Sequence, residues 1–248
     1  MECTASFART RAQNGSAGPS PTGGLGMDSK DEVRQDLLKY GNLLTQKGLV
    51  VAAGGNISAR CGNLMYIKPS GFAFDELSAE DYVGCDIATG QAVDGNRKPS
   101  CEYLAHLACY RRRNDVGAVV HAHPPMALAV VNAGEQIRPL TPDFVAYLGR
   151  VEHLPFIVPG GPELAEAVGE KVARASAIVM QNHGAITVGR NLREAYYRML
   201  VLEDAAKSIV ASYAIRPPRF LTDQEVDAIS NMEAEAYRMK LLANRVAQ

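Results

Sequence analysis

The stretch that decides the fold is Gly117–His123, which reads GAVVHAH. Its small and β-branched residues predict a β-strand, because such residues pack well on a pleated surface. Side chains of a strand alternate between its two faces, so residues two apart share a face. His121 and His123 are therefore expected to project to the same side at the end of this strand.

A second segment, Ala177–Val188, reads AIVMQNHGAITV and again combines apolar runs with a histidine. The runs 177–180 and 185–188 predict two strands, and Gln181–Gly184 between them predicts a turn. His183 stands in that turn, where a side chain can project from the edge of a sheet.

Helical and strand patterns mix along the rest of the chain. Apolar residues at helical spacing predict a helix over 30–47 that stops at Gly48. Ser100 is expected to cap a second helix, which ends at Arg111–Arg113, where positive charge suits a helix C-terminus. Further helices are expected from Met126, from 192 to about 211 and from 223 to about 244, and short strands over 57–59, 64–67, 82–87 and 91–93. This mixture predicts one α/β domain with helices packed on a sheet.

The chain divides into a tail and a domain. Residues 1–26 are rich in Gly, Ser, Pro and Thr, so they are expected to be a disordered tail, and residues 27–248 are expected to form the domain. No apolar segment follows Arg9 and Arg11, which argues against a secretory signal. Met27 is a candidate natural first residue, which mass spectrometry of native protein would test.

Charge and cysteine content narrow the functional class. The 26 Lys and Arg nearly balance the 27 Asp and Glu, so there is no electrostatic case for binding nucleic acid or an acidic membrane surface. No apolar run approaches the roughly 20 residues of a membrane helix. The five cysteines are odd in number and include no C-x-x-C pair, so a reducing cytoplasm is the expected location.

Three histidines form a candidate metal site. Zinc favours imidazole ligands, and a catalytic zinc keeps one position open for substrate. The pair His121 and His123 is a weak signal alone, and a lone His183 is more often structural. Together they predict a divalent-metal site. His106, inside a helix, and His153, near a loop, are expected to be structural.

Glu102 is the candidate acid and base. It is expected in the first turn of its helix, where a carboxylate interacts favourably with the helix dipole, so simple helix capping is the alternative. The catalytic interpretation requires Glu102 to lie beside the metal, because a metal-bound carbonyl acidifies the neighbouring C–H bond.

Three small-residue turns can provide donors for an anion. They are Gly55-Asn56, Ser70-Gly71 and Ser100-Cys101, and each alone is more often an ordinary turn. Together, their backbone N–H groups, hydroxyls and amide could bind one phosphate. None of them matches a Walker or Rossmann glycine pattern.

Five motifs in order resemble the class II aldolase/adducin family. They are Gly54–Ser58 (GGNIS), Lys68–Gly71 (KPSG), Pro99–Glu102 (PSCE), His121–His123 (HAH) and Asn182–Gly184 (NHG). The resemblance keeps the order and the approximate spacing from about residue 30 to about residue 240. Such an ordered set is far more specific than any single motif.

The resemblance implies a three-layer α/β/α sandwich with a central mixed, largely antiparallel sheet, and often a homotetramer with active sites at subunit interfaces. It implies Zn²⁺, or another divalent metal such as Mn²⁺ or Co²⁺, held by His121, His123 and His183. It also implies a small phosphorylated sugar as substrate. The positions that it assigns to the phosphate are Gly55, Asn56, Ser70, Gly71, Ser100 and Cys101, and those that it assigns to catalysis are Glu102 and, by a loose match, Tyr237.

Two departures from the family's aldolases bear on the substrate. The aldolases usually carry Ser-Ser before the glutamate, whereas this chain has Ser100-Cys101, which weakens one hydroxyl donor. They also carry a tyrosine soon after the H-x-H strand, whereas this chain reads LTPDF over Leu140–Phe144. The group that contacts the aldehyde end of the substrate is therefore expected to differ.

The implied reaction is reversible cleavage of a ketose 1-phosphate to dihydroxyacetone phosphate and an aldehyde. Sugar-acid phosphate decarboxylases and methylthioribulose-phosphate dehydratases of the family share the metal site and remain alternatives. The family's ribulose-phosphate 4-epimerases carry aspartate at the position of Glu102, so they fit less well. A non-catalytic adducin-like scaffold is a distant alternative, because it would be expected to lose metal ligands.

Overall fold

The computed structural model describes residues 29–243, and the tail expected over residues 1–26 lies outside this range. The helices are α1 (Lys30–Gln46), α2 (Tyr103–Arg112), α3 (Pro125–Asn132), α4 (Pro142–Leu148), α5 (Pro162–Val172), α6 (Leu192–Tyr213), α7 (Asp223–Ser230) and α8 (Glu233–Ala243), with short 3-10 turns η1 (Phe74–Glu76) and η2 (Ala79–Asp81). The strands are β1 (Asn56–Cys61), β2 (Leu64–Ile67), β3 (Val83–Asp86), β4 (Ala92–Asp94), β5 (Ala118–Ala122), β6 (Val151–Leu154), β7 (Ala177–Met180) and β8 (Gly184–Gly189).

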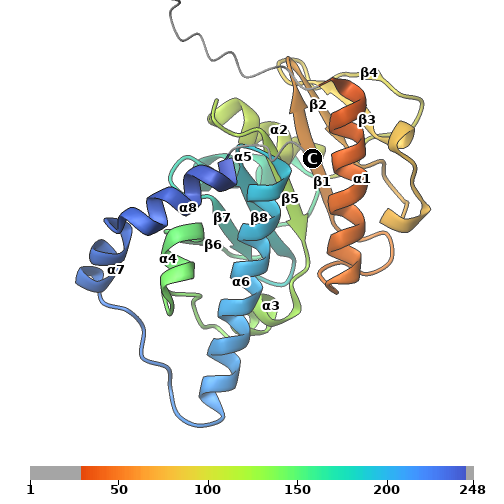
Figure 1. Cartoon of the computed structure of the whole chain (residues 1–248). Helices are drawn as coiled ribbons and strands as arrows, with labels where there is room; N and C mark the ends of the chain where they lie inside the picture. Colours follow the sequence, from red (N-terminus) through yellow and green to blue (C-terminus); the bar gives the residue numbers. More distant parts are fainter. Residues whose placement is uncertain (1–28, 244–248) are drawn as a thin grey trace, which may run out of the picture.

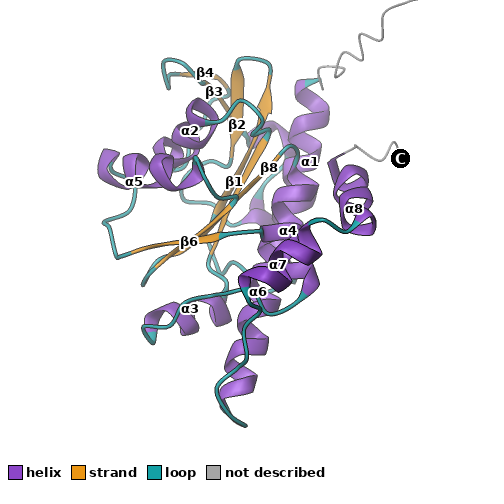
Figure 2. Cartoon of the chain, turned by 90° about the vertical axis from the view of Figure 1, so that its left-hand side faces the viewer, coloured by secondary structure: helices purple, strands orange, loops and turns teal. Residues whose placement is uncertain are grey.

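Within residues 29–243, the eight strands form one sheet in the order β4-β3-β2-β1-β5-β8-β7-β6. Only the β6–β7 pair is parallel, and the other pairs are antiparallel. Helices α1, α4 and α6 lie on one face of the sheet (Figure 1), and α2 and α5 lie on the other face (Figure 2). The predicted three-layer α/β/α sandwich with a largely antiparallel sheet is confirmed.

Strand alternation divides the core into two clusters. Ala118, Val120 and Ala122 of β5 pack in the cluster under α1 and α6, whereas Val119 packs in the cluster under α2 and α5. His121 has the same parity as Val119, so its side chain lies on the α2 face. The sheet therefore directs His121 toward the beginning of α2.

Several boundaries follow from local signals. Ser29 begins α1 with a reciprocal capping box to Glu32, and Gly48 takes a positive φ of 67° just beyond its end. Asn231 ends α7: its side-chain amide donates to the carbonyl of Asp227, which competes with continued helix. The single helix predicted over 223–244 is therefore wrong, because α7 and α8 are separate helices.

One other prediction needs correction, and three elements were not predicted. Helix α2 begins later than predicted, because the residue that precedes it is Glu102 and not Ser100. The Ser100 hydroxyl accepts a hydrogen bond from the Glu102 backbone N–H at 3.3 Å. His153 lies in strand β6, one residue before the loop that follows Leu154, so its predicted position near a loop is confirmed, although the strand itself was not predicted. Helices α4 and α5 were not predicted, since their proline starts and short apolar stretches resemble loops.

No helix among residues 29–243 has both the length and the apolar composition required to span a bilayer.

Candidate active site

The candidate site lies where strand β5 ends and strands β1 and β8 begin. Asn56, the first residue of β1, pairs with His121 of β5, and Gly184 begins β8 on the other side of β5. His123 follows β5 directly, and its backbone N–H donates to the carbonyl of Leu49 at 2.8 Å. Antiparallel pairing thus brings side chains from distant segments to one edge of the sheet.

The structure brings the three predicted metal ligands together. Ligand nitrogens of His121, His123 and His183 all lie within 4.8 Å of one another. The His121 ring centroid lies 5.1 Å from that of His123 and 5.0 Å from that of His183. One divalent ion can therefore be reached by all three imidazoles after a small adjustment of the side chains.

Two glycines leave the space that these rings occupy. A Cβ added at Gly184 would lie 2.8 Å from ring atoms of both His121 and His123, and 2.6 Å from the carbonyl oxygen of Ala122. A Cβ at Gly54 would lie 3.2 Å from the His123 ring. A side chain at Gly184 would therefore collide with the rings of His121 and His123, and one at Gly54 would crowd the ring of His123.

The hydrogen bonding of His121 fits a metal ligand. Its Nδ1 lies 3.0 Å from the carbonyl oxygen of Ala185, so Nδ1 carries a proton and Nε2 is the atom that can ligate a metal. Within residues 29–243 this buried Nε2 has no hydrogen-bond partner of acceptable geometry, although a carboxylate oxygen of Glu102 lies 3.0 Å away. A buried lone pair beside a carboxylate is unfavourable unless a proton or a cation lies between them, so these residues fit a bound cation.

The charge state of His123 also suits metal binding. Burial, together with the neighbouring His121 and His183, lowers the pKa of His123 to about 4. The imidazole is therefore neutral near pH 7 and can ligate a metal without first losing a proton.

Glu102 stands among the same histidines. Its Oε2 lies 3.0 Å from His121 Nε2, and its Oε1 lies 2.8 Å from His183 Nε2. The amide of Asn56 donates to Oε2 at 2.9 Å. Burial by itself raises the pKa of Glu102, but His121 and His183 outweigh burial and hold this pKa well below its usual value. The carboxylate is thus ionised and lies beside the candidate metal site, as the catalytic interpretation requires.

Two of the predicted phosphate turns are joined to each other. Pro69 and Pro99 form an isolated β-bridge, in which the Ser70 N–H donates to Lys98 and the Ser100 N–H donates to Lys68. This bridge places Ser70 beside Ser100, which are 30 positions apart in the sequence. Gly71 takes a φ of 85°, which the turn requires and which other residues rarely adopt.

One cavity of about 330 Å³ collects these groups. All six residues predicted to contact phosphate line it, together with Glu102, His123 and His183. His121 lies behind this wall and is 1% exposed. The candidate metal ligands, the candidate acid and base, and the anion donors therefore surround one space.

Lys68 is a site residue that the sequence reasoning missed. It lines the cavity and is 2% exposed, and its Nζ donates to the carbonyls of Ala53 at 2.7 Å and Gly55 at 3.1 Å. Burial lowers the pKa of Lys68 to about 8. Its position just before the Pro69-Ser70 turn was the available signal, because a cation beside an anion-binding turn is chemically apt.

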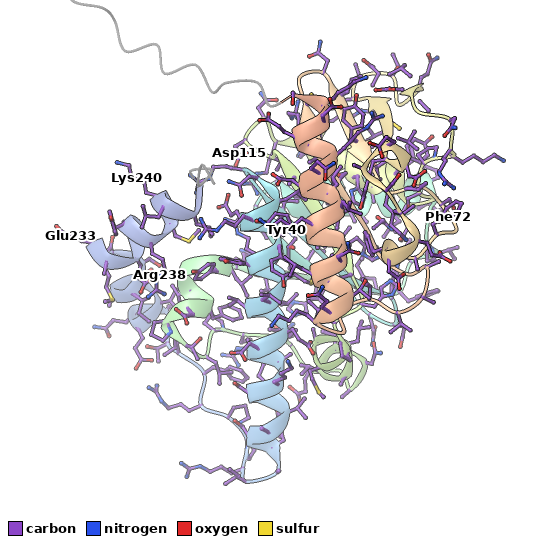
Figure 3. The ribbon with its side chains drawn as sticks, turned by 45° about the vertical axis from the view of Figure 1, so that its right-hand side comes forward. Tyr40, Phe72, Asp115, Glu233, Arg238 and Lys240 are labelled. Carbon is purple, nitrogen blue, oxygen red and sulfur yellow. The ribbon has the colours of Figure 1, made fainter. Side chains whose placement is uncertain are left out.

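Tyr237 is not brought to the cavity of this chain. It lies on α8 with 65% of its surface exposed and does not line the cavity. Arg238 anchors α8 to α4 through Asp143, while Glu233 and Lys240 project outward (Figure 3). A role for Tyr237 would thus require a second copy of the chain and stays a prediction.

Comparison with known proteins agrees with this geometry. The family described as Class II Aldolase and Adducin N-terminal domain matches residues 35–210. The chain belongs to this family. The residues of the candidate site from Gly54 to His183 all fall within the matched range.

Individual relatives include aldolases and a decarboxylase. L-fuculose phosphate aldolase of Methanococcus maripaludis is 33% identical over 172 residues, which cover 69% of this chain and 93% of the relative. A 3-oxo-tetronate 4-phosphate decarboxylase of Haemophilus influenzae is 29% identical over 201 residues, which cover 79% of this chain and 94% of the relative. A solved structure of an L-fuculose 1-phosphate aldolase superposes with a TM-score of 0.75 at 32% identity, covering 87% of this chain and all of that one. These homologues are enzymes of the aldolase and lyase kind.

Proposed function

We propose that this protein is a metal-dependent aldolase that reversibly cleaves a ketose 1-phosphate to dihydroxyacetone phosphate and an aldehyde. The observation that carries the proposal is the position of Glu102. Its carboxylate lies 3.0 Å and 2.8 Å from two of the three clustered histidines and faces the same cavity as the anion-binding turns. A base and an anion site beside a metal site suit the removal of a proton next to a carbonyl.

His121, His123 and His183 would hold the metal, with Zn²⁺ as the expected ion and Mn²⁺ or Co²⁺ as candidates. Such an ion, when bound, supplies Lewis acidity that withdraws electrons from the oxygen atoms of a sugar ketone and its neighbouring hydroxyl. Three neutral imidazoles suit this role, because they leave the positive charge of the ion undiminished.

The phosphate of the substrate would bind at the joined turns. Gly55, Asn56, Ser70, Gly71, Ser100 and Cys101 are the proposed contacts. Lys68 would add a positive charge to this site. Two of its three N–H groups donate to backbone carbonyls, and the third remains for a phosphate oxygen.

Glu102 would move the proton that completes the reaction. In cleavage, the ionised carboxylate of Glu102 would take up the C4 hydroxyl proton, the C3–C4 electron pair would pass to C3, and C4 would leave as the aldehyde carbon. Glu102, in its protonated form, then gives its proton to C3, which yields dihydroxyacetone phosphate. In condensation, the ionised carboxylate removes that same proton.

Decarboxylation of a sugar-acid phosphate is the second candidate, and the relative from Haemophilus influenzae favours it. The same site would then release carbon dioxide where the aldolase releases an aldehyde. The dehydratase and the 4-epimerase of the family are further alternatives, and a scaffold without catalysis is a distant one. We also propose a homotetramer in the cytoplasm, with Tyr237 of one subunit acting at the site of another.

A substrate panel tests the proposal. Purified protein loaded with Zn²⁺, Mn²⁺ or Co²⁺ is incubated with ketose 1-phosphates and keto-acid phosphates, and dihydroxyacetone phosphate, carbon dioxide and epimers are measured. The proposal expects dihydroxyacetone phosphate from a ketose 1-phosphate. Release of carbon dioxide alone would replace it by the decarboxylase.

A variant at Glu102 tests the role of the carboxylate. Glu102→Gln should lower kcat by roughly 10² to 10⁴-fold, because general acid and base catalysis contributes about that much. Metal content should stay near that of the wild type, since the three histidines are unchanged. Retained activity would remove Glu102 from the mechanism.

A further inference from the structure

A line of buried polar groups runs from the interior of the sandwich to Glu102. The Tyr110 hydroxyl lies 2.8 Å from Ser58 Oγ, which lies 2.7 Å from Nδ1 of His106. Nε2 of His106 lies 2.6 Å from Oδ1 of Asn56, and the Asn56 amide nitrogen lies 2.9 Å from Glu102 Oε2. Tyr110, Ser58 and His106 have at most 1% of their surface exposed.

Only one orientation of the Asn56 amide is favourable. The structure places the amide nitrogen of Asn56 toward Glu102 and its oxygen toward Nε2 of His106, and an amide oxygen accepts hydrogen bonds but donates none. With the amide reversed, two oxygen atoms would meet at 2.9 Å. The acceptor Oδ1 therefore requires a proton on Nε2 of His106.

The remaining protons follow in turn. Because Nε2 of His106 carries the proton, Nδ1 of the neutral ring accepts from the hydroxyl of Ser58. Ser58 has then used its only proton, so Tyr110 donates to Ser58 Oγ. Every hydrogen bond in the line points toward Glu102, and such chains polarise one another cooperatively.

The environment of His106 keeps the ring neutral. The ring is fully enclosed, and burial, followed by the nearby His121, lowers its pKa to about 3. In a neutral ring whose Nδ1 accepts from Ser58, the one proton must lie on Nε2, so a single tautomer is available. His106 is thus fixed in charge and in proton position throughout the range in which an enzyme works.

We propose that His106 is a positioning residue that fixes the Asn56 amide and, through it, the carboxylate of Glu102. One amide N–H of Asn56 then holds Glu102 Oε2, and the other N–H remains for a ligand in the cavity that Asn56 lines. Asn56 is thereby shared between the proposed base and the proposed phosphate site. This role rests on the proposed function, and it adds a residue that touches neither substrate nor metal ligand.

A purely structural role for His106 would be to fill space between α2 and β1. Two substitutions of similar size separate the roles. The amide nitrogen of Gln reaches about as far as Nε2 of histidine, whereas that of Asn reaches only about as far as Nδ1. His106→Gln can keep the donor to Asn56, whereas His106→Asn loses this donor and keeps only a polar group near Ser58.

The kinetic test compares these variants on the substrate that the wild type cleaves. His106→Gln should keep kcat within about 5-fold, and His106→Asn should lower it about 30-fold or more, because small misplacements of catalytic groups can cost about 10²-fold. Metal content should not change in either variant. Equal kcat losses in the two variants, or a loss that follows thermal stability alone, would overturn the proposal.

His153→Gln is the matched control, because His153 is the other histidine outside the candidate metal site. Among the described residues, its Nε2 accepts a hydrogen bond only from the Ile137 N–H, at 3.2 Å. This variant should leave kcat unchanged. A kcat loss in His153→Gln as large as that in His106→Asn would count against a specific effect of His106.

The proton position is tested without any substrate. Zinc-loaded protein labelled with ¹⁵N-histidine should show a His106 ring that is neutral, protonated on Nε2 and constant from about pH 5 to pH 8; His106→Gln identifies the signal. A proton on Nδ1, or titration within that range, would overturn the proposal. If the wild type cleaves no ketose 1-phosphate, the proposed function fails, and the spectrum still decides the direction of the line.

Discussion

At the scale of single residues, Lys68 makes a pH-dependent prediction. Burial lowers its pKa to about 8, so the charged form is lost as pH rises through about 8. A phosphate ester is fully a dianion only above its second pKa of about 6. KM for the phosphorylated substrate should therefore be lowest between about pH 6 and pH 8 and rise above that range.

Lys68→Arg is the matched variant for this prediction, because a guanidinium keeps its charge at all these pH values. Its KM should be higher than that of the wild type at pH 7, since the planar group fits the pocket less well, but should not rise between pH 7 and pH 9. Lys68→Met should raise KM at every pH. If KM rose with pH in Lys68→Arg as it does in the wild type, the rise would come from a titrating group other than Lys68.

At the scale of secondary-structure elements, Gly184 controls how closely strand β8 approaches strand β5. Gly184 begins β8, and a Cβ there would meet the Ala122 carbonyl and both rings of His121 and His123. Gly184→Ala should lower the free energy of unfolding by about 1–3 kcal/mol, a typical cost of overpacking. It should also lower metal content, measured by elemental analysis.

Gly169→Ala is the control, because a Cβ at this position in α5 would make only an ordinary contact of 3.6 Å with Ala108. Alanine favours a helix over glycine, so this variant should be equally or slightly more stable and keep its metal. Normal metal content in Gly184→Ala would show that the strand start tolerates a shift.

Metal removal should affect the same elements. A bound ion would tie the end of β5 to the turn between β7 and β8, because His121 and His123 belong to the first and His183 to the second. Binding to the folded state alone stabilises it by about 2.7 kcal/mol at a free metal concentration 100 times Kd. A chelator should thus lower Tm, and added Zn²⁺ should restore it. An unchanged Tm would show that no ion is bound in that place.

The elements also show what the sequence could and could not predict. Strands β5, β7 and β8 and the histidines on them were predictable, because apolar alternation and short motifs are local signals. The join of the Ser70 and Ser100 turns was not, since the Pro69–Pro99 bridge depends on pairing across the fold. Strand β6 was missed because a short edge strand with Glu152 and His153 carries a weak apolar pattern.

At the scale of the whole molecule, exposed apolar residues near the cavity predict assembly. Phe156 is 54% exposed and Val158 is 69% exposed, and both stand just before Pro159, which lines the cavity. A neighbouring subunit that covers them would also narrow the cavity. Light scattering coupled to size exclusion should find a tetramer. The double variant Phe156→Asp, Val158→Asp should give smaller species with reduced activity.

Val93→Asp serves as the control, because Val93 is 57% exposed on the edge strand β4 and does not line the cavity. It should leave the mass of the assembly unchanged. A monomeric wild type with full activity would contradict the proposed arrangement of active sites at subunit interfaces.

Tyr237 can be tested in the same assembly. Tyr237→Phe removes only the hydroxyl of an exposed side chain, so folding and metal content should not change. If the hydroxyl acts at a neighbouring subunit's site, kcat should fall about 10-fold or more while KM stays close to its original value. Unchanged kcat would leave Tyr237 without a catalytic role.

The pairing of β5 with β8 has a consequence for how the protein is made. Residues 118–122 pair with residues 185–189, so the third histidine reaches the other two only after a long stretch of chain has been synthesised and the intervening strands have formed. A nascent chain that still lacks β8 has two imidazoles and no closed ligand set. Uptake of the proposed metal would therefore follow the synthesis of β8, and a ribosome-bound chain stalled before residue 183 should bind zinc far more weakly than the released protein.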